Sequence, residues 1–226
     1  MAAMDSQQKF RAVEFWFEFA STYSYLSAAR LPQLARNAGI SIVYRPFLLG
    51  PIFKEQGWND SPFNIYPAKG RYMWRDLERR CELYGLPFRR PGDFPRNGLR
   101  AARIATALAA SPGLEQHLPE FTTAVYRANF AEDQNISESK VLENILRKIP
   151  GTAAAETIAQ IKSAAASNEI KTQVRANTER AVQLGIFGAP SFVVYAAGTA
   201  TPEAAFELFW GDDRLADAFA LAQQPY

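Results

Sequence analysis

The stretch VEFWFEFASTYSYL, Val13–Leu26, organises the rest of the chain. Its first half alternates apolar side chains with Glu14, Trp16 and Glu18, the period-2 pattern of a β-strand. A hydroxyl-rich turn then begins at Ser21 and leads into a run of good helix formers. A strand that enters a helix through such a turn places Ser21 beside free backbone N–H groups and the positive end of the helix dipole. This local pattern predicts a place that can hold an anion.

The composition limits the chemistry that the chain can perform. It has 226 residues, a formal net charge of +2, one cysteine (Cys81) and one histidine (His117). A single cysteine can form neither an intrachain disulfide nor a C-x-x-C redox pair, and with one histidine it cannot build a zinc cluster. A Ser-His-Asp hydrolase would need His117, and the sequence has no G-x-S-x-G turn. We therefore expect no metal site and no dithiol oxidoreductase.

Charge and hydropathy favour a soluble cytoplasmic protein. No apolar run approaches the roughly 18 residues of a membrane span, and the N-terminal residues lack the apolar core of a secretory signal. No basic run is long enough to indicate a nucleic-acid surface, and the net charge is small. We expect no nucleic-acid and no membrane partner.

Strands are expected only towards the two ends of the chain. Ile40–Phe47 is the second strand, and with the first strand and the helix between them it forms a βαβ unit with parallel strands. Strand character returns at Ser191–Ala196 and Phe206–Trp210, joined as an antiparallel hairpin, and a last helix runs from Asp212 to Ala222. Pro32 is expected to kink or break the first helix.

Between the strands the sequence predicts helices and one long loop. Residues 49–70 are expected to form an aromatic-rich loop because Gly and Pro interrupt them. Six helices follow: Lys69–Tyr84, Arg96–Ala110, Leu118–Phe130, Glu138–Lys148, Ala153–Ala166 and Glu169–Leu184. Without this block a βαβ…αββα core remains. The fold class is therefore α/β, a thioredoxin-like fold with a large all-α insertion, with residues 10–50 and 185–226 as the thioredoxin-like domain and 51–184 as the helical insertion domain.

Ser21 has two interpretations on local grounds. It can simply cap the helix, or its hydroxyl can donate to a bound anion. No base is at hand to activate it as a nucleophile, and a hydrogen-bond donor needs none. The donor role is therefore the functional hypothesis for Ser21.

Two further strand-end turns carry candidate residues. In GIFGAPSF, Gly185–Phe192, a cis Ala189-Pro190 bond would leave the Ala189 N–H and C=O free to pair with an extended peptide, although local sequence favours an ordinary turn. In the turn after Trp210, Asp212 and Asp213 can cap a helix or pair with an ammonium group. These turns fall at strand ends, where α/β cores bind ligands.

A fourth stretch contains Asn59 and Lys69. Asn59 could hydrogen-bond to a carboxylate and Lys69 could neutralise one, and the alternative is that both are solvated loop residues. Cys81 falls within a helical pattern and is interpreted as a buried small hydrophobe. The arginines at 75, 79 and 80 are interpreted as a solvated face.

Five stretches in order give the chain its resemblance to a known family: FEFASTYSYL (Phe17–Leu26), RPFLLGPIFKEQGWN (Arg45–Asn59), YPAKGRYMWRDLERRC (Tyr66–Cys81), GIFGAPSFVV (Gly185–Val194) and FWGDDRL (Phe209–Leu215). The chain resembles the 2-hydroxychromene-2-carboxylate isomerase family, which is close to the kappa-class glutathione transferases and the DsbA-like thioredoxin-fold proteins. It departs from the pattern at Thr22, where many relatives have proline, at Asp212, where a small hydroxyl or amide residue is common, and in a longer hairpin at Ala197–Ala205.

The resemblance implies a glutathione site. Its cofactor-binding residues, besides the catalytic Ser21, are Asn59, Lys69, Ala189, Pro190, Asp212 and Asp213. In such a site the Ser21 hydroxyl faces the glutathione sulfur and Lys69 reaches the glycyl carboxylate. Ala189, before a cis-Pro190, pairs with the cysteinyl backbone, and the turn at Asp212 and Asp213 holds the γ-glutamyl end.

The implied activity is a glutathione-dependent cis–trans isomerisation of 2-hydroxychromene-2-carboxylate-type aromatic keto acids by reversible thiolate addition. Arg45 is the candidate for the substrate carboxylate. Four aromatic residues could wall in the aryl ring or pack in the core: Phe47, Phe53, Trp58 and Trp74. Two alternatives stay open, a kappa-class-like transferase that conjugates electrophiles and a non-enzymatic DsbA-like binding protein. A homodimer is also expected.

Overall fold

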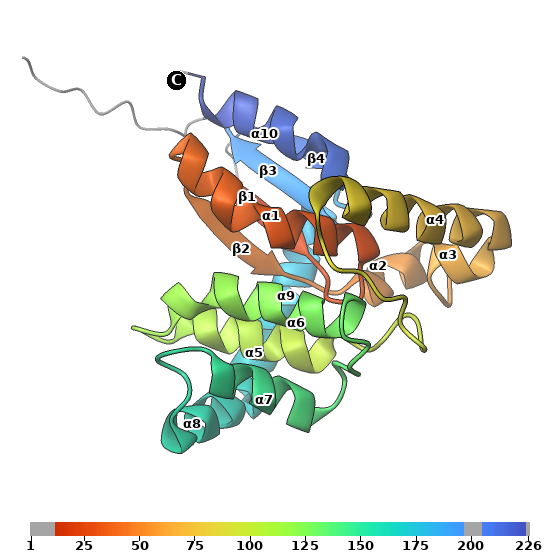
Figure 1. Ribbon diagram of the computed structural model, residues 1–226. Coiled ribbons are helices and arrows are strands. Elements are labelled where there is room, and N and C mark those ends of the chain that lie inside the picture. Colours follow the sequence, from red (N-terminus) through yellow and green to blue (C-terminus); the bar gives the residue numbers. More distant parts are fainter. Residues whose placement is uncertain (1–11, 197–204, 225–226) are drawn as a thin grey trace, which may run out of the picture.

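Four strands form one mixed sheet in the computed structural model, which describes residues 12–196 and 205–224 (Figure 1). The strands are β1 (Val13–Phe17), β2 (Ile42–Pro46), β3 (Ser191–Tyr195) and β4 (Phe206–Trp210), in the order β2-β1-β3-β4. β1 and β2 are parallel, whereas β3 is antiparallel to both β1 and β4. The predicted βαβ unit and C-terminal hairpin strands are confirmed. The predicted hairpin turn, 197–204, lies outside the described residues.

The N-terminal and C-terminal helices cover the two faces of this sheet. α1 (Thr22–Ala38) and α10 (Leu215–Ala222) pack on the face that carries Phe15 and Phe192. α2 (Leu49–Glu55) and α9 (Asn168–Gln183) pack on the face that carries Trp16. Every residue of β1 is buried, Glu14 included, so the polar half of the alternating pattern does not face solvent. β1 is a central strand covered on both sides.

The remaining helices make up the rest of the block between β2 and β3. In chain order they are α3 (Pro62–Ile65), α4 (Pro67–Tyr84), α5 (Leu99–Ala110), η1 (Glu115–His117), α6 (Leu118–Phe130), α7 (Ser139–Lys148) and α8 (Ala155–Ala166). α4 ends at Gly85, whose φ of 63° suits a residue without a side chain. A short turn, η2 (Asp212–Arg214), leads into α10. Among the residues that the structure describes, no helix has both the length and the apolar character to cross a membrane.

Pro32 does not break α1, so the predicted break is wrong. The helix continues through it to Ala38. Proline has no N–H to donate to the carbonyl of the residue four positions earlier, here Ala28. The Thr123 hydroxyl of α6 lies 3.2 Å from the Ala28 oxygen and 3.0 Å from the Pro119 oxygen, and it can donate to either. A side chain from the neighbouring helix is thus in place to supply the hydrogen bond that the proline cannot make.

Residues 49–70 do not form the predicted aromatic-rich loop, so that prediction is wrong. They form α2, α3 and the first turn of α4. Pro51, Pro62 and Pro67 all lie in the first turn of a helix. The N–H groups of a first turn have no partner within the helix, so a proline there costs no hydrogen bond. Pro62 and Pro67 are the first residues of their helices, and Pro51 is the third residue of α2. The sequence pattern predicts a loop at all three positions.

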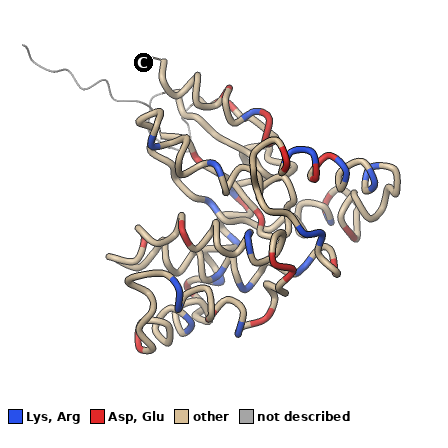
Figure 2. The backbone as a smooth tube through the Cα atoms, in the orientation of Figure 1, with Lys and Arg blue, Asp and Glu red and all other residues tan. Residues whose placement is uncertain are grey.

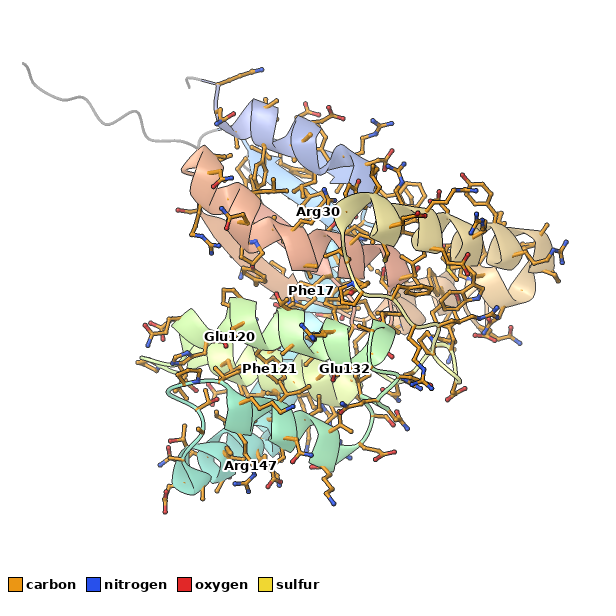
Figure 3. All side chains as sticks on the ribbon, viewed as in Figure 1. Phe17, Arg30, Glu120, Phe121, Glu132 and Arg147 are labelled. Carbon is orange, nitrogen blue, oxygen red and sulfur yellow. The ribbon has the colours of Figure 1, made fainter. Side chains whose placement is uncertain are left out.

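The helical block shares its core with the sheet. α6 packs along α1, and Phe121 of α6 belongs to the same buried cluster as Phe17 of β1 (Figure 3). Two side chains of α6 also reach the turn after β1: the Tyr126 hydroxyl donates to the Glu18 carbonyl at 2.7 Å, and the Asn129 amide donates to the Phe19 carbonyl at 3.3 Å. The thioredoxin-like fold with a helical insertion is confirmed. The exact division at residues 51 and 184 stays a prediction.

Candidate functional site

A cavity of about 1930 Å³ opens at the edge of the sheet where β1 and β4 end and β3 begins. α2, α3 and α4 supply its opposite wall. All seven residues expected to catalyse or to bind the cofactor line it: Ser21, Asn59, Lys69, Ala189, Pro190, Asp212 and Asp213. These residues come from four separate stretches of the chain, and the fold brings them together around one cavity.

Ser21 caps the 17-residue helix α1 and also faces the turn before β3. Its oxygen accepts a hydrogen bond from the Ser24 N–H at 3.3 Å, which is the capping role. Its hydroxyl donates to the Ala189 carbonyl at 2.8 Å. The two local interpretations are therefore compatible, because the same oxygen caps the helix and lies on the cavity wall.

The Ala189-Pro190 bond is cis. The Ala189 N–H has no acceptor among the described residues, as expected for an edge that pairs with a peptide. The Ala189 carbonyl is not free, however, because it accepts the Ser21 hydroxyl. That part of the expectation is corrected. A peptide ligand would either share this oxygen with Ser21, because a carbonyl oxygen can accept two hydrogen bonds, or take the place of Ser21 there.

The two aspartates of η2 differ in their surroundings. Asp212 is 6% exposed and accepts hydrogen bonds from the Ser27 hydroxyl at 2.7 Å and from the Arg30 guanidinium at 2.5 Å. Arg30 in turn lies 3.9 Å over the Tyr84 ring. The charge of Asp212 is thus balanced inside the protein (Figure 3 labels Arg30 on α1). Asp213 has an exposed side chain at the cavity rim, and its one ionic partner in the described part of the chain is Arg214 at 3.6 Å.

The opposite wall carries aromatic side chains and three cations, Lys54, Lys69 and Arg80. Phe53 and Trp58 line the cavity with ring centroids 5.5 Å apart, and Tyr66 meets the Trp58 ring edge-on. The Lys69 ammonium lies 4.8 Å over the Tyr66 ring and is exposed, as is the side chain of Asn59. Of the four aromatic candidates, Phe53 and Trp58 line the cavity. The other two, Phe47 and Trp74, are core residues.

Arg45 does not belong to this site. It lies on β2, and its guanidinium donates to the buried Glu14 carboxylate at 2.8 and 2.9 Å. Glu14 also accepts hydrogen bonds from the Trp16 indole at 2.9 Å and the Tyr195 hydroxyl at 3.4 Å. The structure therefore gives Arg45 a role in neutralising a buried acid and does not bring it to the cavity.

Replacing Arg45 with methionine should lower stability and leave the cavity unchanged. Glu14 would lose its counter-charge, although two neutral donors remain and Arg45 is 38% exposed, so we expect a loss of about 1–2 kcal/mol. Urea unfolding measures this loss, and the KM values for substrate and glutathione should match the wild type. A selective rise in the KM for a carboxylate substrate would instead return Arg45 to the site.

Glu18 and Arg80 line the cavity, although the sequence does not predict a role for either in the site. Glu18 belongs to the turn after β1, where it looked like the polar half of the strand pattern. Arg80 lines the cavity too, near the acids Asp76 and Asp212, whereas its neighbours Arg75 and Arg79 are exposed and paired on α4 as expected. Figure 2 shows both signs of charge along this helix. No sequence signal separates Arg80 from the other two, because only the helix position turns it inwards.

The one cysteine cannot supply the reacting sulfur. Cys81 is buried and does not line the cavity. Burial, with a smaller contribution from the charge of Asp212, raises the pKa of its thiol to about 11. A thiol with that pKa is almost fully protonated at neutral pH. Any thiolate at Ser21 must therefore come from a ligand.

Comparisons with known proteins agree with this architecture. The model of the DSBA-like thioredoxin domain matches residues 12–221. A 2-hydroxychromene-2-carboxylate isomerase of Sphingobium xenophagum is 31% identical over 207 residues, which cover 91% of this chain and 94% of the relative. The glutathione S-transferase kappa 1 of Rattus norvegicus is 26% identical over 211 residues, which cover 91% of this chain and 88% of the relative.

A solved structure gives the same result at the level of the fold. The structure of a 2-hydroxychromene-2-carboxylate isomerase superposes with a TM-score of 0.73 and 24% sequence identity, over 92% of this chain and 93% of that one. Its likeness supports the fold, and the family model with the isomerase relative establishes the family. The chain belongs to the DSBA-like thioredoxin family together with the 2-hydroxychromene-2-carboxylate isomerases, and it is similar to the kappa-class glutathione transferases.

Proposed function

We propose that the protein is a glutathione-dependent isomerase of 2-hydroxychromene-2-carboxylate-type aromatic keto acids. The strongest support is the position of the Ser21 hydroxyl, which lies on the cavity wall at the start of α1, 2.8 Å from the carbonyl oxygen before cis-Pro190. The chain has no reactive cysteine of its own that could act there. The name of the isomerase relative supports this activity, and the name of the transferase relative supports the use of glutathione.

The residues of the cavity fit glutathione. A tripeptide needs a backbone edge, and the Ala189 N–H offers one. Its carboxylate ends need cations and its ammonium end needs an anion. Lys69 is exposed on one wall, and Asp213 is exposed at the rim. The volume of about 1930 Å³ exceeds the usual range for one small ligand and leaves room for an aromatic co-substrate.

When bound, glutathione would supply a thiolate that adds reversibly to a conjugated double bond and so permits rotation about it. The protein has to hold that thiolate in its ionised form. The Ser21 hydroxyl can rotate from the Ala189 carbonyl towards the sulfur, and the N–H groups that begin α1 favour negative charge there. The released Ala189 carbonyl can then accept an amide N–H of the ligand, so no hydrogen bond is lost.

The charged residues would set the ligand's direction. Lys69 would neutralise the glycyl carboxylate, with Asn59 beside it. Asp213 would pair with the γ-glutamyl ammonium. We assign Asp212 a supporting role, because Arg30 and Ser27 already occupy its carboxylate. Phe53 and Trp58 would contact the aryl ring of the substrate.

Replacing Lys69 with methionine should raise the KM for glutathione roughly tenfold and leave kcat nearly unchanged. Lys69 would contact a part of glutathione far from the sulfur, so its loss removes binding that is equal in ground and transition states. Arg71→Met is the matched control, because Arg71 is exposed on the same helix and does not line the cavity. Steady-state kinetics at varied glutathione concentration measure both. An unchanged KM in Lys69→Met would contradict the assignment.

A spectrophotometric assay of 2-hydroxychromene-2-carboxylate with and without glutathione tests the function itself. We expect conversion to the trans keto acid only when glutathione is present, with no net consumption of thiol. Conjugation of a model electrophile without conversion of the chromene would favour the transferase alternative. Absence of both activities, with binding retained, would favour a DsbA-like binding protein.

A further inference from the structure

Glu18 is an acid in the cavity wall that the roles above leave unused. It precedes Ser21 by three residues in the same strand-to-helix turn. One carboxyl oxygen, Oε2, accepts the Ala20 N–H at 2.8 Å. The other, Oε1, has no hydrogen-bond partner among the described residues, and Glu18 forms no ion pair within them. Glu18 is half-buried as a residue, and it lines the cavity.

The segment 96–98 packs against this oxygen and leaves room for it. A Cβ atom added to Gly98 would lie 2.5 Å from Oε1 and 3.1 Å from the Cβ of Phe19, so the absence of a side chain at Gly98 leaves space for the carboxyl group. The segment is held by Arg96, which is 7% exposed and donates to the side chains of Asn129 and Asp133. The packing around the free oxygen is therefore fixed by groups other than Glu18.

The charged and titratable groups around Glu18 do not neutralise it. From the segment before α5, the terminal nitrogens of Arg96 donate to Asn129 and Asp133, its Nε has no hydrogen-bond partner among the described residues, and none of the three donates to Glu18. From α6, the Tyr126 hydroxyl donates to the Glu18 main-chain carbonyl, and burial raises the pKa of that phenol. Desolvation raises the pKa of the Glu18 carboxyl from 4.5 to about 7, although the Ala20 N–H opposes this. The side chain can therefore both give and take a proton near neutral pH.

The substrate class of the proposed function needs such a group. In a 2-hydroxychromene-2-carboxylate, one carbon carries both a hydroxyl and the ring oxygen. Opening the ring breaks the bond from this carbon to the ring oxygen, whose electron pair stays on that oxygen. The hydroxyl loses its proton, and its electron pair forms the ketone. The ring oxygen gains a proton and becomes a phenol, so the atoms and charges balance when one group moves a proton from the first oxygen to the second.

We propose that Glu18 is this group, a general acid–base catalyst that opens the cyclic hemiketal before the double bond isomerises. The inference rests on the proposed function, but it assigns a separate step to a separate residue. Ser21 would act on the sulfur and Glu18 on the substrate oxygens. The proton transfer requires no part of glutathione.

The test compares Glu18→Gln with the wild type on two substrates. Gln keeps an oxygen for the Ala20 N–H and cannot transfer a proton. We expect turnover of 2-hydroxychromene-2-carboxylate to fall about a hundredfold or more. An open-chain analogue, the cis isomer of 2-methoxybenzylidenepyruvate, cannot form the ring, and its isomerisation should stay within about threefold of the wild type. Glu18→Asp should recover part of the lost activity.

A second measurement does not depend on activity. The folded carboxyl takes up a proton at pH values where the unfolded one, with a pKa of 4.5, has lost it. The free energy of unfolding should therefore fall as the pH rises from 4.5 to about 7, and Glu18→Gln should abolish this part of the pH dependence. Urea unfolding across this range measures it without glutathione or substrate.

The outcomes separate the two proposals. Equal losses on both substrates, or no loss on either, would overturn the role of Glu18. A carboxyl that titrates near 4.5 would also overturn it. Conversion of the chromene by the wild type without glutathione would contradict the proposed function alone, and the comparison of the two substrates would still decide the role of Glu18.

Discussion

Replacing Ser21 with alanine should slow turnover on the order of tenfold or more and raise the pKa of the bound glutathione thiol. The substitution removes the hydroxyl donor that would stabilise the thiolate, and donors aimed at developing or fixed negative charge contribute much of the catalysis in such sites. It also removes the N-cap of α1, which we expect to cost about 1 kcal/mol of stability. Steady-state kinetics, with urea unfolding run in parallel, separate the two effects.

Ser24→Ala is the matched control for this substitution. Ser24 lies in the same turn, but its hydroxyl is buried, has no hydrogen-bond partner within the described ranges and does not line the cavity. We expect near wild-type kinetics and unchanged or slightly higher stability, because an unpartnered buried hydroxyl is lost. Full activity of Ser21→Ala at saturating glutathione would contradict the donor role and leave Ser21 as a helix cap only.

Replacing Arg30 with methionine should lower the free energy of unfolding by about 3 kcal/mol. Asp212 is 6% exposed, and Arg30 is its one ionic partner among the described residues. Without Arg30 the carboxylate would stay buried with the Ser27 hydroxyl as its one side-chain hydrogen-bond donor among the described residues, and Arg80 interacts with it only through space. The turn η2, which carries Asp213 to the cavity rim, would lose its anchor to α1, so the KM for glutathione should rise as well.

Arg36→Met controls for the loss of an arginine from α1. Arg36 is exposed, forms no ion pair among the described residues and donates a hydrogen bond to Gln33 on the same helix, so we expect a change within about 0.5 kcal/mol. Combining Arg30→Met with Asp212→Asn should recover part of the loss, because the uncompensated charge is then gone. If the double variant is as unstable as the sum of the single variants, the ion pair is not the cause.

The sequence predicted the order of strands and the residues of the strand-end turns, because both depend on local patterns. Alternation of apolar residues and turn composition identified β1, β3 and β4. The prolines were misjudged. The pattern predicts that Pro51, Pro62 and Pro67 interrupt helical structure, but all three lie in a first helical turn, which tolerates proline. Whether a proline begins a helix or ends one depends on where the helix starts, which periodicity alone does not locate.

The candidate site was predictable only in part, for a different reason. Ser21, Lys69 and Asp213 are polar residues in turns, which a sequence pattern can single out. Arg45 and Glu18 were misjudged because their roles depend on burial. A buried acid beside a cation becomes an ion pair, as at Glu14, whereas a buried acid without one becomes a proton carrier, as we propose for Glu18. The packing of α6 and the segment before α5 decides which case holds, and these elements are distant in the sequence.

The absorbance of the bound glutathione thiolate, followed as the pH is varied, tests the central claim most directly. The turn at Ser21 should stabilise a thiolate that this chain does not supply. We expect glutathione bound to the wild type to ionise well below the usual thiol pKa of about 8.5, and Ser21→Ala to move this value upwards. An unshifted pKa in the wild type, or the same pKa in both proteins, would contradict the account.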